Sequence, residues 1–303
     1  MALDKLNRLR ELLRSYGSCL VAYSGGVDSV FLARVAREVL GEKSLAVIAD
    51  SASLPRRELQ EALAIAQQFE IPVRVVHTRE FDNPAYLANP ANRCYFCKHE
   101  LFTELEPLAR AEGFGVIAYG ENASDAADFR PGAKAAAEFQ VRAPLKEAGL
   151  TKAEIRELSA QLGLPTADKP QMACLSSRIP HGEVVSPEKL GMIEAAERML
   201  RDLGFYDVRV RHHELVGTGN VGQPVGSPVA PTRHLARIEV GLGEMGNFLK
   251  ENNFLRIAET LKKLGYAHVT LDLNGYRRLG DGPLLARNLQ SRVADAPAAS
   301  PIA

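Results

Sequence analysis

The sequence predicts an α/β fold: a parallel sheet with helices on both faces, followed by a smaller α+β domain. Apolar runs of strand length occur at 19–23, 45–49, 73–77 and 116–119, and segments with helical spacing of apolar residues separate them. Strands that alternate with helices need crossover connections, which produce a parallel sheet covered on both faces. At 303 residues the chain exceeds the ~250 at which one core usually stops growing, so we expect two domains.

Each element of the first part has its own local signal. An amphipathic helix ends at Gly17, and a capping box of Thr151 and Glu154 opens the last helix of this part. After the third strand the chain, including residues 92–98, is expected to be irregular until a helix that ends at Gly113. A helix is predicted at 2–16 before the first strand, and helices at 30–40 and 55–69 are predicted between the first three strands.

The order of elements changes in the last third of the chain. A helix, two strands, a helix and a strand are predicted at 188–203, 208–213, 236–240, 255–264 and 268–273. Residues 217–232 are rich in glycine and proline, which predicts a mobile loop. We therefore expect a first domain over 1–183, a second over 186–282, and a partly disordered tail over 283–303.

Composition and charge narrow the class of protein. A hydrophobic content of 46% and a charged content of 24% are those of a soluble globular protein. There is no apolar run long enough to cross a membrane and no signal peptide, so we expect a cytoplasmic protein without a membrane partner. Lys+Arg and Asp+Glu both number 37, which argues against a nucleic-acid partner because such proteins usually carry basic excess.

The stretch after the first predicted strand reads Tyr-Ser-Gly-Gly-Val-Asp-Ser and leads into a helix. In this context backbone N–H groups and a helix N-terminus gather around an anion, and Gly25 and Gly26 allow close approach of phosphate oxygens. Ser24 and Ser29 add hydroxyl donors, and Asp28 offers oxygen ligands for Mg²⁺. These residues predict a nucleotide-phosphate site; the alternative is a plain glycine turn of an α/β fold.

Two common nucleotide motifs do not fit this stretch. The motif G-x-x-x-x-G-K-[ST] requires a lysine that is absent from the turn, and G-x-G-x-x-G requires a different glycine spacing. The stretch instead resembles the PP-loop of ATP pyrophosphatases, S-G-G-x-D-S. The resemblance implies that the turn holds the β,γ-pyrophosphate of ATP and releases it while AMP passes to a substrate oxygen.

The four cysteines have no secretory context, so we expect reduced thiols that bind or react. Cys94-x-x-Cys97 fits a redox pair, half of a zinc site or half of an iron–sulfur site. A redox pair normally opens a helix in a thioredoxin-like unit, which is not expected here. Cys174 is the natural third thiol, and a closed zinc site would need His99 or His181 as its fourth ligand.

Cys174 itself lies among residues that favour a reactive thiol. Lys169, Arg178 and His181 are cationic, and nearby cations lower the pKa of a thiol. The alternative is a buried apolar residue, which is what we expect of Cys19 at the start of the first strand.

Arg209 and Arg211 are expected on one side of the strand 208–213, with Val208 and Val210 on the other side. Two arginines at this spacing can hold one phosphate or two carboxylates. A solvated strand face is the alternative.

Three segments together resemble the LarE family of ATP-dependent sulfur transferases, which act in the nickel-pincer nucleotide pathway. They are the PP-loop, the segment from Arg142 that reads R-A-P-L-K…T-K-A-E-I-R-E-L-S-A-Q-L-G-L-P, and K-P-Q-M-A-C-L-S-S-R around Cys174. The resemblance extends from the first helix to Tyr276-Arg277, which is nearly the whole chain.

The resemblance implies that ATP adenylylates a carboxylate of pyridinium-3,5-biscarboxylate mononucleotide. Cys174, at the family's sulfur-donor position, then forms a thioester, and cleavage of its Cβ–S bond leaves a thiocarboxylate product and dehydroalanine. Family members with three active-site cysteines can instead hold a [4Fe-4S] cluster with a transferable sulfide, and Cys94, Cys97 and Cys174 place the chain with these. Arg209 and Arg211 match family arginines that hold anionic groups of the substrate. A homo-oligomer is also implied.

Three other functions remain possible at this point. A tRNA thiolase can share a PP-loop and three cysteines, although the neutral net charge disfavours it. An ammonia-using PP-loop synthetase would need no cysteine. A regulatory or metal-carrying module would bind ATP without releasing pyrophosphate.

Overall fold

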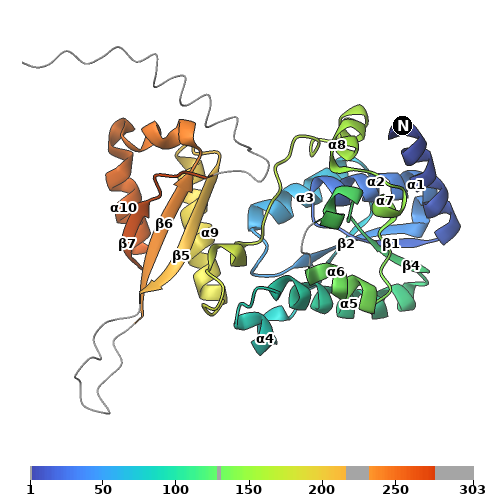
Figure 1. The fold of residues 1–303 in the computed structure, drawn as a ribbon, viewed down its shortest axis with the longest axis horizontal. Coiled ribbons are helices and arrows are strands. Elements are labelled where there is room, and N and C mark those ends of the chain that lie inside the picture. Colours follow the sequence, from blue (N-terminus) through green and yellow to red (C-terminus); the bar gives the residue numbers. More distant parts are fainter. Residues whose placement is uncertain (1, 128–130, 216–231, 277–303) are drawn as a thin grey trace, which may run out of the picture.

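A computed structural model describes residues 2–127, 131–215 and 232–276 (Figure 1). Nearly all of the predicted mobile loop at 217–232, and the whole predicted tail at 283–303, lie outside the described residues. The described part contains a four-stranded sheet and a three-stranded sheet. None of its helices is long and apolar enough to span a membrane.

The first sheet has the strand order β3-β2-β1-β4, and all of its pairings are parallel. This confirms the predicted α/β class. Chain order reverses beside β1, so the carboxyl ends of β1 and β4 flank a topological switch point, where open sheets of this kind bind ligands. The strands are β1 (Cys19–Ala22), β2 (Ser44–Asp50), β3 (Val73–His77) and β4 (Val116–Tyr119).

Helices cover both faces of this sheet because side chains of the central strands alternate between two cores (Figure 1). Cys19 and Val21 pack on one side, so the expected core position of Cys19 is confirmed, and Leu20 packs on the other. The helices packed on the Cys19 side include α1 (Ala2–Tyr16), α2 (Val27–Leu40), α3 (Arg56–Gln68), α7 (Pro144–Glu147) and α8 (Lys152–Gln161). The helices on the Leu20 side include α5 (Arg93–Glu112) and α6 (Pro131–Glu138).

One element was predicted wrongly. Residues 92–98 are not irregular, because α5 begins at Arg93 and carries Cys94 and Cys97 in its first turns. The N–H of Arg93 bonds to the carbonyl of Pro90 at 2.9 Å, so the preceding turn continues into the helix. Apart from Arg93, the buried residues of α5 begin only at Phe102, so its start has no apolar stripe that the sequence could reveal.

The second sheet is smaller and mixed, as predicted for an α+β unit. It contains β5 (Val208–Leu215), β6 (Arg233–Val240) and β7 (Tyr266–Leu271) in that order, with β5–β6 antiparallel and β6–β7 parallel. Residues of α9 (Pro187–Asp202) and α10 (Asn253–Lys263) complete a core separate from those of the first sheet. The boundary between the two domains near residues 183–186 stays a prediction.

Candidate active site

The glycine turn, named here the glycine loop (residues 24–26), joins β1 to α2 at the switch point. Gly25 has φ +70°, and a Cβ atom there would lie 2.6 Å from the Cβ of Ala62 on α3, so the position requires glycine. The Ser29 hydroxyl accepts from the Ser24 N–H at 3.1 Å and donates to the Gly26 carbonyl at 3.1 Å. Ser29 is buried and therefore shapes the loop, whereas Ser24 is exposed.

The N-terminus of α2 is arranged to receive an anion. Gly26 occupies the N-cap position, and among the described residues no side chain caps the helix through it. The first N–H groups of α2 can therefore donate hydrogen bonds to an anion bound beside the glycine loop.

Two lysines reach the glycine loop from distant parts of the chain. Lys152 at the start of α8 donates to Asp28 at 2.5 Å. Lys169 forms ion pairs with Glu58 at 2.7 Å and Glu61 at 3.3 Å, and its Nζ lies 3.5 Å from the carbonyl of Gly25. The turn itself contains no lysine, and the fold brings the ammonium groups of Lys152 and Lys169 close to it.

Asp28 sits in a charged but partly desolvated place. Burial raises its pKa above the ordinary value, and Lys152 acts in the opposite direction without cancelling the effect. The Asp125 carboxylate adds to the rise, and the Asn122 amide donates to Asp28 at 3.4 Å. Asn122 and Asp125 follow β4, so the ends of the two strands at the switch point meet here.

A cavity of about 480 Å³, named here the glycine-loop cavity, extends from this loop to Cys174. Its lining brings together most of the predicted nucleotide site and the predicted sulfur donor. The lining includes Ser24, Gly25, Gly26, Asp28, Lys152 and Cys174.

The donor segment (residues 173–178) is held by groups from several elements. The N–H of Leu175 bonds to the carbonyl of Ser53 at 2.9 Å, and the hydroxyls of Tyr86 and Ser176 are 2.8 Å apart. Arg93 on α5 donates to the carbonyl of Ser176 at 3.1 Å. These contacts fix the segment at the edge of the first sheet.

The three cationic side chains expected around the Cys174 thiol have other partners. Lys169 pairs with Glu58, Arg178 pairs with Glu197, and the Nδ1 of His181 lies 3.3 Å from the carbonyl of Asn89. Arg93, which the sequence did not single out, contacts the sulfur instead, with Nη2 3.9 Å from Sγ. Arg93 is 81 residues away in the chain, so only the fold could reveal it.

The three predicted active-site thiols influence one another electrostatically. Burial, then the Glu80 carboxylate, then Cys174 and Cys94 raise the pKa of the Cys97 thiol. Burial and then Cys174 raise the pKa of Cys94, while Arg93 acts against this rise. Cys97 packs against the core cluster that contains Leu175 of the donor segment, and Arg93, which precedes Cys94 on α5, contacts the Cys174 sulfur.

Glu80 is a further buried acid in this region. It is 2% exposed; its Oε1 accepts from the Ser53 hydroxyl at 3.3 Å, and its Oε2 has no hydrogen-bond partner among the described residues. Within those same residues, no three His, Cys, Asp or Glu side chains are grouped closely enough to hold a metal. His99, one suggested fourth ligand, packs against the rings of Tyr95 and Phe139.

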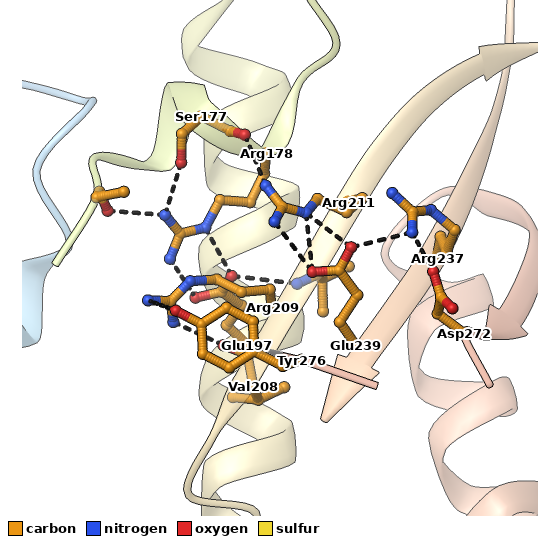
Figure 2. A network of polar contacts seen from close by, with 12 residues as sticks. Ser177, Arg178, Glu197, Val208, Arg209, Arg211, Arg237, Glu239, Asp272 and Tyr276 are labelled. Carbon is orange, nitrogen blue, oxygen red and sulfur yellow. Dashed lines mark hydrogen bonds and ion pairs between the residues drawn. The ribbon is translucent and has the colours of Figure 1, made fainter. Parts of the chain in front are cut away.

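Arg209 and Arg211 lie on β5 as predicted but contact different partners (Figure 2). Arg209 is 7% exposed, stacks 4.8 Å from the ring of Tyr276, and lines a neighbouring cavity of about 660 Å³. Arg211 donates to both carboxylate oxygens of Glu239 at 3.1 Å and to the carbonyl of Ser177 at 2.9 Å. Burial and then the charge of Arg178 lower the pKa of Arg209.

Comparison with known proteins places the chain among PP-loop enzymes. The NAD synthase family matches residues 4–88, which contain the glycine loop. Pyridinium-3,5-bisthiocarboxylic acid mononucleotide synthase of Lactiplantibacillus plantarum is 32% identical over 258 residues, covering 85% of this chain and 86% of that protein. This chain belongs to the LarE family. It is an ATP-dependent enzyme of the PP-loop superfamily.

Two further proteins resemble this chain over almost their full length. An uncharacterized Synechocystis protein is 42% identical over 90% of this chain and 95% of its own length. An uncharacterized Methanocaldococcus jannaschii protein is 25% identical over 89% of this chain and 95% of its own length. The likeness therefore includes both sheets.

The residues of this LarE protein suit the groups that its chemistry implies. Asp28 and Asp125 both line the glycine-loop cavity, and carboxylate oxygens are preferred ligands of Mg²⁺. Thiolates are the usual ligands of iron–sulfur clusters, so Cys94, Cys97 and Cys174 are of the type that would hold one, but as they lie in the described residues they are not grouped closely enough to do so.

Proposed function

We propose that this LarE protein adenylylates a carboxylate of pyridinium-3,5-biscarboxylate mononucleotide and converts it to a thiocarboxylate for nickel-pincer cofactor synthesis. One observation carries the proposal: the glycine loop and Cys174 line the same cavity. The printed name of the Lactiplantibacillus relative, a synthase of the corresponding bisthiocarboxylic acid mononucleotide, supports the choice of substrate.

In the first step, ATP binds with its terminal phosphates at the N-terminus of α2, where Lys152 and Lys169 offset their negative charge. Asp28 is the proposed ligand for Mg²⁺. A carboxylate oxygen of the acceptor attacks the α-phosphorus. The bond from this phosphorus to the bridging oxygen breaks, and pyrophosphate leaves with the electron pair.

In the second step, the thiolate of Cys174 attacks the acyl carbon of the adenylate. AMP leaves with the electron pair of the broken C–O bond, which gives a thioester. Loss of the Cα proton and cleavage of the Cβ–S bond then leave dehydroalanine in the chain. The sulfur keeps the electron pair and departs as the thiocarboxylate of the product.

A second form of the proposal keeps the sulfur of Cys174 in the protein. Here Cys94, Cys97 and Cys174 would hold a [4Fe-4S] cluster, which when bound would carry an externally supplied sulfide for transfer to the acyl carbon as AMP leaves. We favour this form because the sacrificial reaction alone gives no role to Cys94 and Cys97.

We also propose that the enzyme is a cytoplasmic homo-oligomer that takes a small-molecule substrate and no nucleic acid. The net charge of +0 supports the last point. Light scattering of the purified protein checks the oligomeric state, and a filter-binding assay with bulk tRNA checks the absence of RNA binding.

The central test follows pyrophosphate and the mass of the intact protein during one reaction. Without iron, sulfur donation by Cys174 removes the elements of H₂S, and peptide mapping should place dehydroalanine at Cys174. Anaerobic, iron-loaded protein should absorb visible light and keep its mass, and Cys94→Ser or Cys97→Ser should remove the absorption while adenylation continues. Full thiocarboxylate formation by Cys174→Ser would refute the role of Cys174, whereas an amide product formed from ammonia by Cys174→Ser would refute the proposal and indicate an ammonia-using synthetase.

A further inference from the structure

Arg178 at the end of the donor segment and Glu197 on α9 form a buried ion pair (Figure 2). Their side chains are 0% and 1% exposed, and the guanidinium makes a two-pronged contact, with Nε–Oε1 at 2.9 Å and Nη2–Oε2 at 3.2 Å. Removing two charges from water costs free energy, so a buried ion pair does not by itself indicate that the pair stabilises the fold. Its other contacts therefore indicate what it does.

Arg178 also holds the main chain on both sides of Cys174. Its Nη1 donates to the carbonyl of Ala173 at 2.7 Å and to that of Cys174 at 3.0 Å. These carbonyls belong to the two peptide groups that flank the Cys174 Cα atom, and both peptide groups are planar. Fixing both planes fixes the direction of the Cα–Cβ bond, and with it the region that the sulfur can reach.

Glu197 links the same arginine to the strand that carries the predicted substrate arginines. Its carboxylate accepts from the N–H of Val210 at 3.1 Å, between Arg209 and Arg211 on β5. Burial alone would raise the pKa of Glu197, but Arg178, Arg201 and Arg209 outweigh burial and lower it. The carboxylate therefore stays ionised and joins the donor segment to β5.

We propose that Arg178 and Glu197 are positioning residues for sulfur transfer, which set Cys174 at a fixed place relative to β5. This inference rests on the proposed function in the form in which the Cys174 thiolate itself attacks the acyl-adenylate. Without the pair, the acyl-adenylate still forms in the glycine-loop cavity, but Cys174 captures it slowly. Water then attacks the acyl carbon instead, which returns the free carboxylate and AMP. Pyrophosphate release is thereby uncoupled from sulfur transfer.

The test compares Arg178→Lys and Glu197→Gln with wild type for the ratio of pyrophosphate released to thiocarboxylate formed. Because a misplacement of about 1 Å can cost roughly 100-fold in rate, we expect the ratio to rise by about tenfold or more. Arg178→Met combined with Glu197→Leu serves as a folding control, since apolar replacement of a buried pair often preserves stability. This double variant should keep the wild-type Tm and still show the raised ratio.

Arg142→Lys is the matched control, because Arg142 makes a similar two-pronged contact with Glu147 on an exposed surface. Its ratio should equal that of wild type. A second readout needs no activity: alkylation of Cys174 by iodoacetamide, followed by peptide mass, should be faster in the Arg178 and Glu197 variants. A ratio that stays at the wild-type value, with both products falling together, overturns the inference, as does an unchanged alkylation rate. Wild type that forms no thiocarboxylate refutes the proposed function instead.

Discussion

Gly25 and Gly17 have the same φ, +70°, in different surroundings. A Cβ atom at Gly25 would meet the Cβ of Ala62 at 2.6 Å, whereas nothing lies within 4 Å of one at Gly17. An alanine in this left-handed region costs roughly 1–2 kcal/mol at either position. An alanine at either position would cause backbone strain, but only an alanine at Gly25 would also clash with α3. Comparing the two variants therefore isolates the effect of the clash at the glycine loop.

Gly25→Ala should lower the free energy of unfolding more than Gly17→Ala, because α3 or the loop must move. The moved loop should also weaken ATP binding by about tenfold, or ~1.4 kcal/mol, while Gly17→Ala leaves binding unchanged. Calorimetric titration with ATP and urea unfolding measure the two effects. Equal ATP affinities in the two variants would show that the loop does not hold the phosphates.

Arg209 and Arg211 give a second comparison between neighbouring residues. Arg209 faces the larger cavity, whereas Arg211 is paired with Glu239 and the donor segment. Loss of a charge-assisted contact to a bound anion costs ~1.5–3 kcal/mol.

Arg209→Ala should raise the KM for the mononucleotide by roughly tenfold or more, in line with that energy, and leave ATP binding unchanged. Arg211→Ala should also raise this KM, but it should in addition change the capture of the adenylate because Arg211 holds Ser177. Steady-state kinetics with each substrate varied in turn provides the measurement. An unaltered KM in Arg209→Ala would return the residue to a structural role.

At the scale of elements, local signals predicted most of the fold. The apolar runs, the glycine stops and the capping box of Thr151 and Glu154 all have the expected structures. The start of α5 was missed because its polar first turns depend on tertiary contacts, chiefly the buried Arg93. Likewise, the strand pattern placed Arg209 and Arg211 on one side, but it could not show that Arg211 pairs with Glu239, which lies opposite Arg209 on β6, whereas Arg209 stacks on Tyr276.

The N-terminus of helix α8 places Lys152 within hydrogen-bond distance of Asp28, so its capping residues can be tested separately. Its N-cap Thr151 makes a complete capping box with Glu154, whereas the N-cap Ser186 of α9 accepts one longer bond, at 3.4 Å, from Lys189. Thr151→Ala should cost about 1 kcal/mol of unfolding free energy, and Ser186→Ala less than that. Urea unfolding of both variants measures the difference; an equal loss would mean that the second bond of the box contributes nothing.

At the scale of the whole molecule, the candidate site is assembled from segments that are far apart in the sequence. The glycine loop, Lys152, Arg93 and the donor segment come from four regions of the chain, and β5 adds a fifth. Composition and spacing indicated the chemistry through the glycine turn and the cysteines. They could not indicate that Lys152 and Lys169 lie near the glycine loop or that Arg93 contacts Cys174, because the contact partners of a charged side chain are set by the tertiary fold.

The two sheets should also respond differently to acid. His212 on β5 is fully buried, with Nδ1 3.1 Å from the Tyr266 hydroxyl and Nε2 3.1 Å from Nδ1 of His234. Burial, then His234 and Lys189, lower its pKa from 6.5 to about 4, while Glu214 acts in the opposite direction and His213 adds to the fall. Among the described residues, His212 is the only histidine that is buried, so the histidines of the first sheet and its helices are at least partly exposed.

Because the folded pKa of His212 is lowered, the unfolded state takes up the proton first. Its contribution to stability is complete above pH 6.5 and is lost as the pH falls towards about 4. A shift of this size corresponds to roughly 3 kcal/mol of unfolding free energy. Hydrogen exchange at β5 and β6 should therefore accelerate over this pH range before exchange at β1 and β2 does. His212→Gln should flatten this dependence and exposed His268→Gln should not; a wild-type second sheet that keeps its protection at pH 4 would contradict the argument.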